Sequence, residues 1–364
     1  MKIRYIFLIF IFFVMFSCNE SDMGIFHGLS VEERIPDGTL PRNLTIGSML
    51  RAGTNLYIAA GDVWRKAGAA DWERIPSPLG GGFHLSTSMA TDGTDIFAVY
   101  FHRNTAETAL FRLDAGDIWT EINIVSAVEG SIQEVKSANN TIFVSRRVSA
   151  NEGRLYYLNG AAFNHINIPM VGSSFNVIHD GTDFWISNRN RIFSGAAPGT
   201  VSDAHSLHGR NTIRGLAAHG GNIFFTYWDG SRRSYIRYIT SAGSPGTYST
   251  SQIFMLNNIR FINISGYYFL LCGTGGRGYF QSEQQFNPSP EHLIRINRPR
   301  GNTLVARNYS SAVELHTAAI LDFFIDGTGP GGSPMPDDTF YALTATRGLW
   351  RNFDTGGGRE WRRE

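Results

Sequence analysis

Lysine, cysteine and charged residues in general are scarce in this sequence of 364 residues. Lysine occurs only at positions 2, 66 and 136, so 29 of the 32 basic residues are arginine. Charged residues make up 17% of the chain and the formal net charge is +1, so no global field draws the molecule to nucleic acid. We therefore expect no nucleic-acid partner, whereas the arginine excess suits bidentate contacts with carboxylate, sulfate or phosphate groups.

The N-terminal apolar run is too short to cross a bilayer. It covers residues 5–16, after the basic Lys2 and Arg4, whereas a spanning helix needs about 20 apolar residues. This length is typical of a signal peptide, although Met15 is not the small residue that ordinary cleavage prefers. The segment Met15-Phe16-Ser17-Cys18 resembles a bacterial lipobox, which implies that Cys18 is acylated and becomes the mature N-terminus.

The cysteine content excludes a disulfide framework, because the chain has only two cysteines. If Cys18 carries the lipid, Cys272 has no partner for a disulfide bond. Cys272 lies in the apolar segment 269–272, which predicts a strand. We therefore expect its thiol to be a small buried hydrophobe rather than a nucleophile.

Glycine and aromatic residues are abundant, with 40 glycines and 13% Phe, Trp and Tyr, which suits short strands joined by tight turns. One pattern recurs at intervals of about 40 residues: a turn, an apolar-aromatic strand, a short loop and a second apolar-aromatic strand. An outer strand with an early aromatic residue follows at Trp72, Trp119 and Phe163. The first strand of the pattern begins at Asn55, Asp95, Thr141, Asp183, Asn222, Tyr267 and Thr339.

Seven such units, each with three or four strands, predict an all-β fold, a seven-bladed β-propeller. Six or eight blades are alternatives, because the interval between the last two units is much longer than the others. The ring could close through the C-terminal segment 360–363, or through segment 31–36 beside it or in its place, since that segment resembles the outer strand 72–76. The expected organisation is a signal peptide at 1–17, a lipidated cysteine and tether at 18–42 that could add a closing strand, and the propeller at 43–364.

One turn links the chain to known propellers. Asp114, Gly116 and Trp119 resemble an Asp-box, the turn of sialidase-like (BNR-like) propellers and of photosystem II assembly factor propellers. That resemblance implies a structural turn between the last two strands of a blade. The leading serine of the box is absent here, since Arg112 takes its place, and Asp354-Thr355-Gly356 with Trp361 is a stretched copy.

No catalytic group stands out in the sequence. Arg-Ile-Pro at 34–36 is similar to an element of sialidases whose arginine grips the substrate carboxylate, but the same triplet recurs at 74–76 and so favours a repeat feature. Sialidases also need a Tyr/Glu nucleophile pair and an acid/base Asp, which the sequence does not identify. His205 and His208 lack further ligands nearby in sequence, so we expect no metal, no cofactor and no catalytic residue.

Arginine recurs in the loop between the second and third strands of the blades. In a propeller these loops share one face, where converging arginines concentrate positive potential. The alternative is that they are solvated, or paired with Glu107, Glu152 and Asp229. Six of the seven loops carry at least one: Arg103, Arg146, Arg147, Arg189, Arg232, Arg233, Arg277 and Arg347. Connections that reach the same face add Arg210, Arg298 and Arg300.

These observations predict a monomeric, non-enzymatic lipoprotein of a bacterial cell envelope, on the periplasmic or surface side of a membrane. One face of the propeller would bind an envelope protein or an acidic glycan, in a binding or scaffolding role. The alternative is a carbohydrate-active enzyme, a glycoside hydrolase or lyase, that acts at the channel mouth. An acidic pair in the channel would favour the enzyme, and an arginine-rich or apolar mouth would favour binding.

Overall fold

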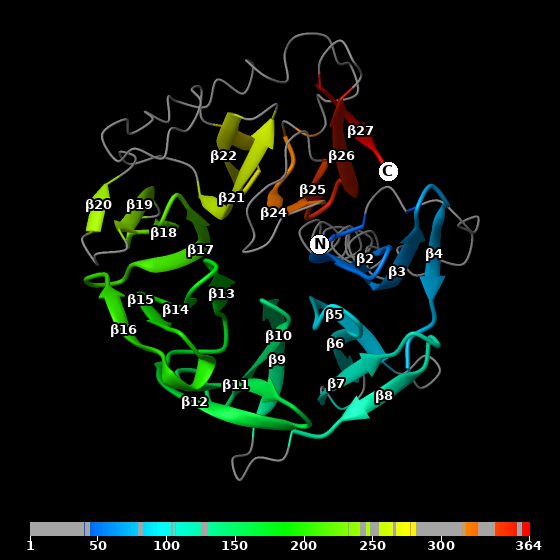
Figure 1. Ribbon diagram of the computed structural model, residues 1–364, viewed down its shortest axis with the longest axis horizontal. Coiled ribbons are helices and arrows are strands. Elements are labelled where there is room, and N and C mark those ends of the chain that lie inside the picture. The colour runs from blue at the N-terminus through cyan, green and yellow to red at the C-terminus, as the bar shows by residue number, and fades with distance from the viewer. Residues whose placement is uncertain are drawn as a thin grey trace, which may run out of the picture.

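The computed structural model shows seven small antiparallel sheets arranged as a ring around a central axis (Figure 1). Six sheets have four strands, and the sixth blade in chain order has three among its described residues. The prediction of an all-β, seven-bladed β-propeller is therefore confirmed. The structure describes residues 40, 44–78, 83–102, 105, 107–124, 130–231, 233–240, 245–247, 255–264, 267–276, 278–281, 315, 317–326, 339–354 and 359–364.

Each blade runs from the channel to the rim in chain order. The innermost strands are β1 (Ser48–Ala52), β5 (Phe83–Thr91), β9 (Ser131–Ala138), β13 (Asn176–His179), β17 (Thr212–His219), β21 (Leu256–Ile264) and β24 (Ile320–Ile325). The second strands are β2 (Asn55–Ala60), β6 (Ile96–His102), β10 (Thr141–Arg147), β14 (Phe184–Asn188), β18 (Asn222–Trp228), β22 (Tyr267–Thr274) and β25 (Phe340–Thr344).

The recurring strands of the sequence are the second and third strands of the blades. The third strands are β3 (Asp62–Ala67), β7 (Thr108–Leu113), β11 (Gly153–Asn159), β15 (Arg191–Gly195), β19 (Ser234–Thr240), β23 (Tyr279–Gln281) and β26 (Leu349–Asp354). The outer strands are β4 (Trp72–Ile75), β8 (Trp119–Ile122), β12 (Ala162–Met170), β16 (Ser202–Ser206), β20 (Pro245–Thr247) and β27 (Arg359–Arg363). A short 3-10 helix, η1 (Pro198–Thr200), precedes β16.

The second strands are largely apolar and buried because neighbouring blades cover them on both faces. Every residue of β14 and of β25 is buried. The core is a series of layers between neighbouring blades: Leu50 and Tyr57 of blade 1, for example, share one cluster with Tyr100 and Phe111 of blade 2. Burial of one such large side chain contributes roughly 1.5–3 kcal/mol. The free Cys272 belongs to such a layer and is fully buried, as the sequence predicts, and burial raises the pKa of its thiol.

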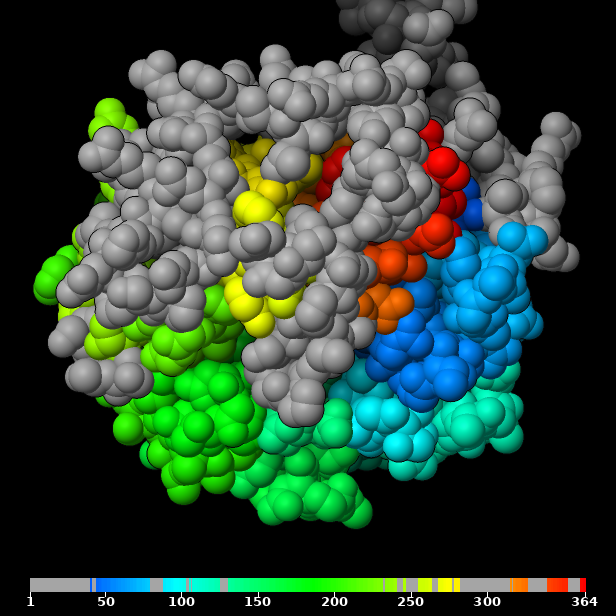
Figure 2. All heavy atoms as spheres, turned by 45° about the horizontal axis from the view of Figure 1, so that its top comes forward, coloured from blue at the N-terminus to red at the C-terminus, as the bar shows by residue number. Residues whose placement is uncertain are grey.

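Blade 7 lies beside blade 1 and closes the ring (Figure 2). The C-terminal strand β27 completes blade 7, as one predicted way of closing expects. Segment 31–36 lies outside the described residues, so its part in closure stays a prediction. The amide of Ile46 donates to the carbonyl oxygen of Thr344 at 2.9 Å. The Glu364 carboxylate contacts Lys66 of blade 1 at 2.5 Å. Packing and ion pairs therefore join the two ends of the described ring.

None of the helices in the described part of the chain is long and apolar enough to span a bilayer.

Candidate functional site

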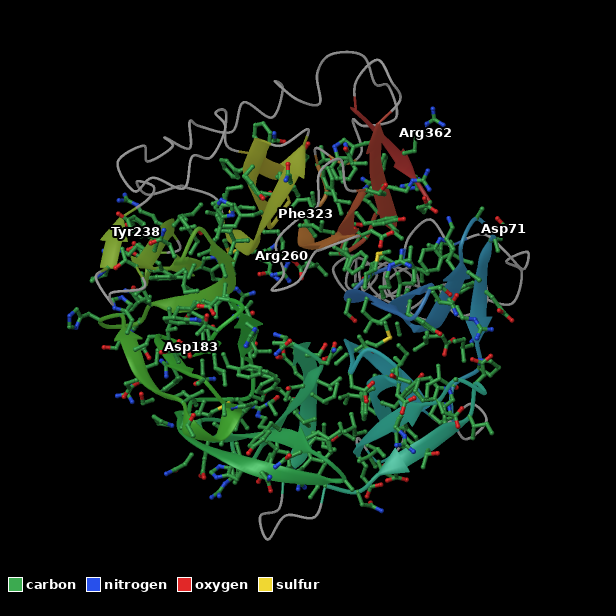
Figure 3. All side chains as sticks on the ribbon, viewed as in Figure 1. Asp71, Asp183, Tyr238, Arg260, Phe323 and Arg362 are labelled. Atoms are coloured by element: carbon green, nitrogen blue, oxygen red, sulfur yellow. The ribbon has the colours of Figure 1, made fainter. Side chains whose placement is uncertain are left out.

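The inner strands surround a central channel with two adjoining cavities of about 530 and 430 Å³. Met49, Val177 and Leu216 line both cavities, so the two are halves of one channel. Arg260 and Phe323 lie at the inner side of the ring, whereas Asp71 and Arg362 lie at its outer side (Figure 3). The polar side chains of the channel come from strands that also carry apolar residues into the blade layers.

Three ion pairs lie in the wall of the channel. Arg260 of β21 contacts Asp322 of β24 at 2.8 Å, and the Arg51 Nε donates to the Asp326 carboxylate at 2.7 Å. On β9, the Lys136 ammonium lies 3.3 Å from the Glu134 carboxylate. These carboxylates line the cavities, but each of the three contacts a cation. Carboxylates therefore do line the described channel, as the enzymatic alternative expects, and each of the three is paired with a cation.

The loops between second and third strands share one side of the ring with the blade-to-blade connections, because neighbouring strands alternate in direction. We call this surface the arginine face. It carries five of the predicted site residues, Arg146, Arg147, Arg189, Arg233 and Arg347, and also Arg210 in the connection from β16 to β17. Arg103, Arg232, Arg277, Arg298 and Arg300 lie outside the described residues, as does Cys18.

Two of the acids expected to neutralise these arginines have other partners, whereas the third, Asp229, has its pKa lowered by backbone hydrogen bonds and in part by the charge of Arg233. Glu152 lies 3.6 Å from Arg154, and Glu107 accepts a hydrogen bond from the Thr105 hydroxyl. The Asp229 carboxylate accepts hydrogen bonds from the amides of Arg233 and Ser231, which lower its pKa. On the arginine face, five exposed arginines form no ion pair with a carboxylate of the described chain: Arg147, Arg189, Arg210, Arg233 and Arg347.

Arg146 differs from the others. It is half-buried, and its Nη2 donates to the Gly130 carbonyl oxygen at 2.7 Å. Arg147 is exposed, and its Nε donates to the Ser149 carbonyl oxygen at 3.3 Å. Arg146 therefore fastens the preceding connection, whereas the side chain of Arg147 is exposed.

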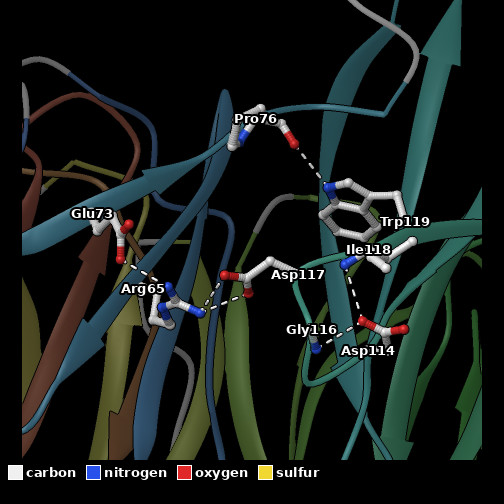
Figure 4. A network of polar contacts seen from close by, with 8 residues as sticks. All are labelled: Arg65, Glu73, Pro76, Asp114, Gly116, Asp117, Ile118 and Trp119. Carbon is white, nitrogen blue, oxygen red and sulfur yellow. Dashed lines mark hydrogen bonds and ion pairs between the residues drawn. The ribbon is translucent and has the colours of Figure 1, made fainter.

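The opposite surface, which we call the aspartate face, consists of the turns between first and second and between third and fourth strands. There the Asp114 carboxylate accepts hydrogen bonds from Gly116 at 2.9 Å and Ile118 at 3.0 Å (Figure 4). The Trp119 indole donates to the Pro76 carbonyl oxygen of the preceding blade at 2.8 Å. These residues build a turn that joins two blades; their likeness to an Asp-box stays a prediction.

The sequence did not predict two groups of charged side chains, the channel ion pairs and Arg214. The channel ion pairs lie on inner strands, whose mixed apolar and polar residues do not repeat from blade to blade. The second group is Arg214, whose guanidinium lies 4.3 Å from the centre of the Trp228 ring. Burial lowers the pKa of Arg214, and the nearby Glu134 opposes this effect. In the described part of the chain no set of His, Cys, Asp or Glu side chains is arranged to hold a metal ion.

Comparison with known proteins places the fold but no family. No family model matches the sequence, and no curated protein matches it. Among solved structures, the chain is similar to an ancestral GH74 enzyme, with a TM-score of 0.62 and 9% identity over 90% of this chain and 48% of that one.

Two further structures are similar over most of the chain. The extracellular domain of a one-component system from B. thetaiotaomicron matches with a TM-score of 0.56 and 10% identity over 90% of this chain. A prolyl endopeptidase matches with a TM-score of 0.55 and 11% identity over 88% of this chain. The chain spans about half the length of these structures, 48% in each case. At such low identity the likeness supports the propeller fold alone.

Proposed function

We propose that this protein is a binding module whose arginine face recognises an acidic glycan. The observation that carries the proposal is the set of exposed arginines without a carboxylate partner: Arg147, Arg189, Arg210, Arg233 and Arg347. A guanidinium presents a planar fork of donors that matches a carboxylate or a sulfate. Several forks on one face bind a polymer with repeated charges better than a single ion.

The carboxylates of the channel are the feature that the enzymatic alternative expects, and their ion pairs are the argument for a binding role. Hydrolysis of a glycoside uses one carboxylic acid as a proton donor and a second carboxylate as base or nucleophile. The carboxylates of Glu134, Asp322 and Asp326 each contact a cation. This arrangement stabilises the wall of a polar channel.

The lipid anchor on Cys18 and the location in a bacterial envelope are part of the same proposal. An anchor would hold the propeller close to a surface rich in glycans. After expression in a bacterium, a Cys18→Ser variant is expected to leave the membrane fraction, whereas a Cys272→Ser variant stays in it. Equal membrane association of both variants would contradict acylation of Cys18.

The glycan proposal is tested with the full chain in detergent and three polymers: polygalacturonate, dextran sulfate and neutral dextran. We expect binding to one or both acidic polymers, weakening with salt, and none to dextran. Replacing Arg147, Arg189, Arg233 and Arg347 by Gln should weaken binding at least about 10-fold, since one lost charged hydrogen bond contributes about 1.5 kcal/mol or more.

The matched control replaces four other arginines by Gln. Each of them already contacts a carboxylate: Arg74, Arg112, Arg154 and Arg191. This variant has the same net charge and is expected to bind much more tightly than the first. Equal loss in both variants would show a nonspecific charge effect and contradict the proposal. Release of reducing ends from either acidic polymer would favour the enzymatic alternative.

A further inference from the structure

We infer that the acidic sugar is held at one sector of the arginine face, between blades 4 and 5. This inference rests on the proposed function. The residues are Arg189 in the turn from β14 to β15, Arg210 in the connection to blade 5, and Arg233 in the loop before β19. We call these three residues the blade 4–5 cluster.

Three loops that are distant in sequence meet at this sector. The Ile213 amide donates to the Arg189 carbonyl oxygen at 2.6 Å, which fixes the blade 4 turn to the start of blade 5. In the same contact region, the Asn190 side chain donates to the Leu207 carbonyl oxygen at 2.8 Å. A Cβ built on Gly230 would lie 3.7 Å from the Cβ of Arg210. The turn of Arg189 thus contacts the connection of Arg210, and that connection lies against the loop of Arg233.

The backbone of Arg189 is a second and independent observation. Its φ is +49°, in the left-handed region that favours glycine and asparagine. The other described non-glycine residues with positive φ are Asp117, Asn139 and Asn140, types that tolerate it. The backbone conformation of this turn therefore does not explain why arginine occupies position 189. Strain of this kind is found where the side chain serves a function.

Aromatic side chains of blade 5 support the loop that carries Arg233. The half-buried Tyr235 stacks on Tyr227 with 5.0 Å between the ring centres, and its hydroxyl donates to Asp229 at 3.0 Å. On the next side of blade 5, the Trp228 indole donates to the Leu256 carbonyl oxygen at 2.8 Å and carries Arg214 on its ring. Tyr227 is buried and Arg214 covers the Trp228 ring, so these rings hold the strands on either side of the Arg233 loop in place.

The proposed function makes the ligand a sugar, and the three arginines require that this sugar carry a carboxylate or a sulfate group. Both anions match the guanidinium fork, so the structure assigns the shared chemistry and polygalacturonate and dextran sulfate distinguish the two. Dextran without charge lacks the group that the cluster would bind.

The experiment compares two triple variants of the full chain with equal charge. One replaces Arg189, Arg210 and Arg233 by Gln, and the other replaces Arg146, Arg147 and Arg347 by Gln. We expect the first to weaken binding of the preferred acidic polymer by about 100-fold or more, and at least about 10 times more than the second. Equal losses would mean a diffuse site, which overturns this inference and leaves the proposed function standing.

Absence of binding by the unmodified chain would instead overturn the proposed function.

A single Arg189→Asn variant separates binding from folding. Because asparagine tolerates the left-handed backbone, its thermal midpoint should equal or exceed that of the unmodified chain while polymer affinity falls about 10-fold. A variant that binds normally would show that Arg189 does not contact the polymer.

Discussion

On the aspartate face, the carboxylates of Asp92, Asp114 and Asp180 accept hydrogen bonds from backbone amides of their own turns. On the arginine face, Arg189 and Arg233 form no ion pair with a described carboxylate. Charged residues are thus gathered on both faces. These aspartates hold their own turns, whereas on the arginine face Arg146 and Arg147 contact backbone carbonyl oxygens and Arg189 and Arg233 form no ion pair. A charge that serves a turn stabilises the fold, whereas a charge left in solvent remains available to a ligand.

The largest effect on stability is expected at Asp180. Its carboxylate accepts hydrogen bonds at 2.8 Å from the amides of Thr182 and Asp183 and from the indole of Trp185. Asp180→Ala removes all three and should lower the free energy of unfolding by about 3 kcal/mol, measured by urea denaturation. Asp183→Ala removes an equal charge from the same turn and should cost less than about 0.5 kcal/mol. Similar losses would mean that charge, and not turn geometry, matters here.

Asp180 also predicts how acid acts on this face. Burial raises the pKa of Asp180, but the hydrogen bonds from Asp183, Thr182 and Trp185 outweigh it, so the net pKa lies below that of a free aspartate. The stabilisation is present above the unfolded pKa and is lost as the pH falls through the folded one. The stability difference between the unmodified chain and Asp180→Ala should therefore shrink below about pH 4.

The next effect concerns His219, in the turn from β17 to β18 on the aspartate face. Its ring stacks on Phe261 at 4.7 Å and lies 4.5 Å from that of Tyr268, and burial lowers its pKa to about 4. Because the unfolded chain takes up the proton first, stability should fall as the pH drops from about 6.5 to 4. Between pH 7 and 5 this loss amounts to about 2 kcal/mol.

The control for His219 is His219→Phe, which keeps an aromatic ring but cannot be protonated. Its stability should change less than that of the unmodified chain between pH 7 and 5 in parallel urea titrations. An identical pH dependence in the two proteins would show that His219 does not carry the effect.

The smallest effect on stability is expected on the arginine face. Replacing Arg147, Arg189, Arg233 and Arg347 by Gln removes no described ion pair, so the thermal midpoint should move by no more than about 2 °C. A large drop would place these arginines among the structural residues, as the aspartates already are. The two faces would then no longer differ in how they use charge.

The sequence located the second and third strands because both are apolar enough to recur visibly. It did not locate the inner strands, since a strand such as β9 alternates buried Ile132 and Val135 with half-buried Gln133, Glu134 and Lys136. Its polar residues are selected by neighbours across the channel, not by position in a repeat. The arginine loops could be predicted from the repeat, but their lack of carboxylate partners could not.

By itself the sequence predicted seven blades, with six or eight as alternatives, and the side of the ring on which the arginine loops stand, because these depend on local periodicity and strand direction. Only the tertiary structure decided which charges meet. Arg260 and Asp322 are far apart in the chain and pair only because blades 6 and 7 are neighbours. Arg189 and Arg233 stand in one sector for the same reason, because blades 4 and 5 are neighbours. Electrostatic partners depend on distances of a few ångströms between blades, which no repeat along one chain specifies.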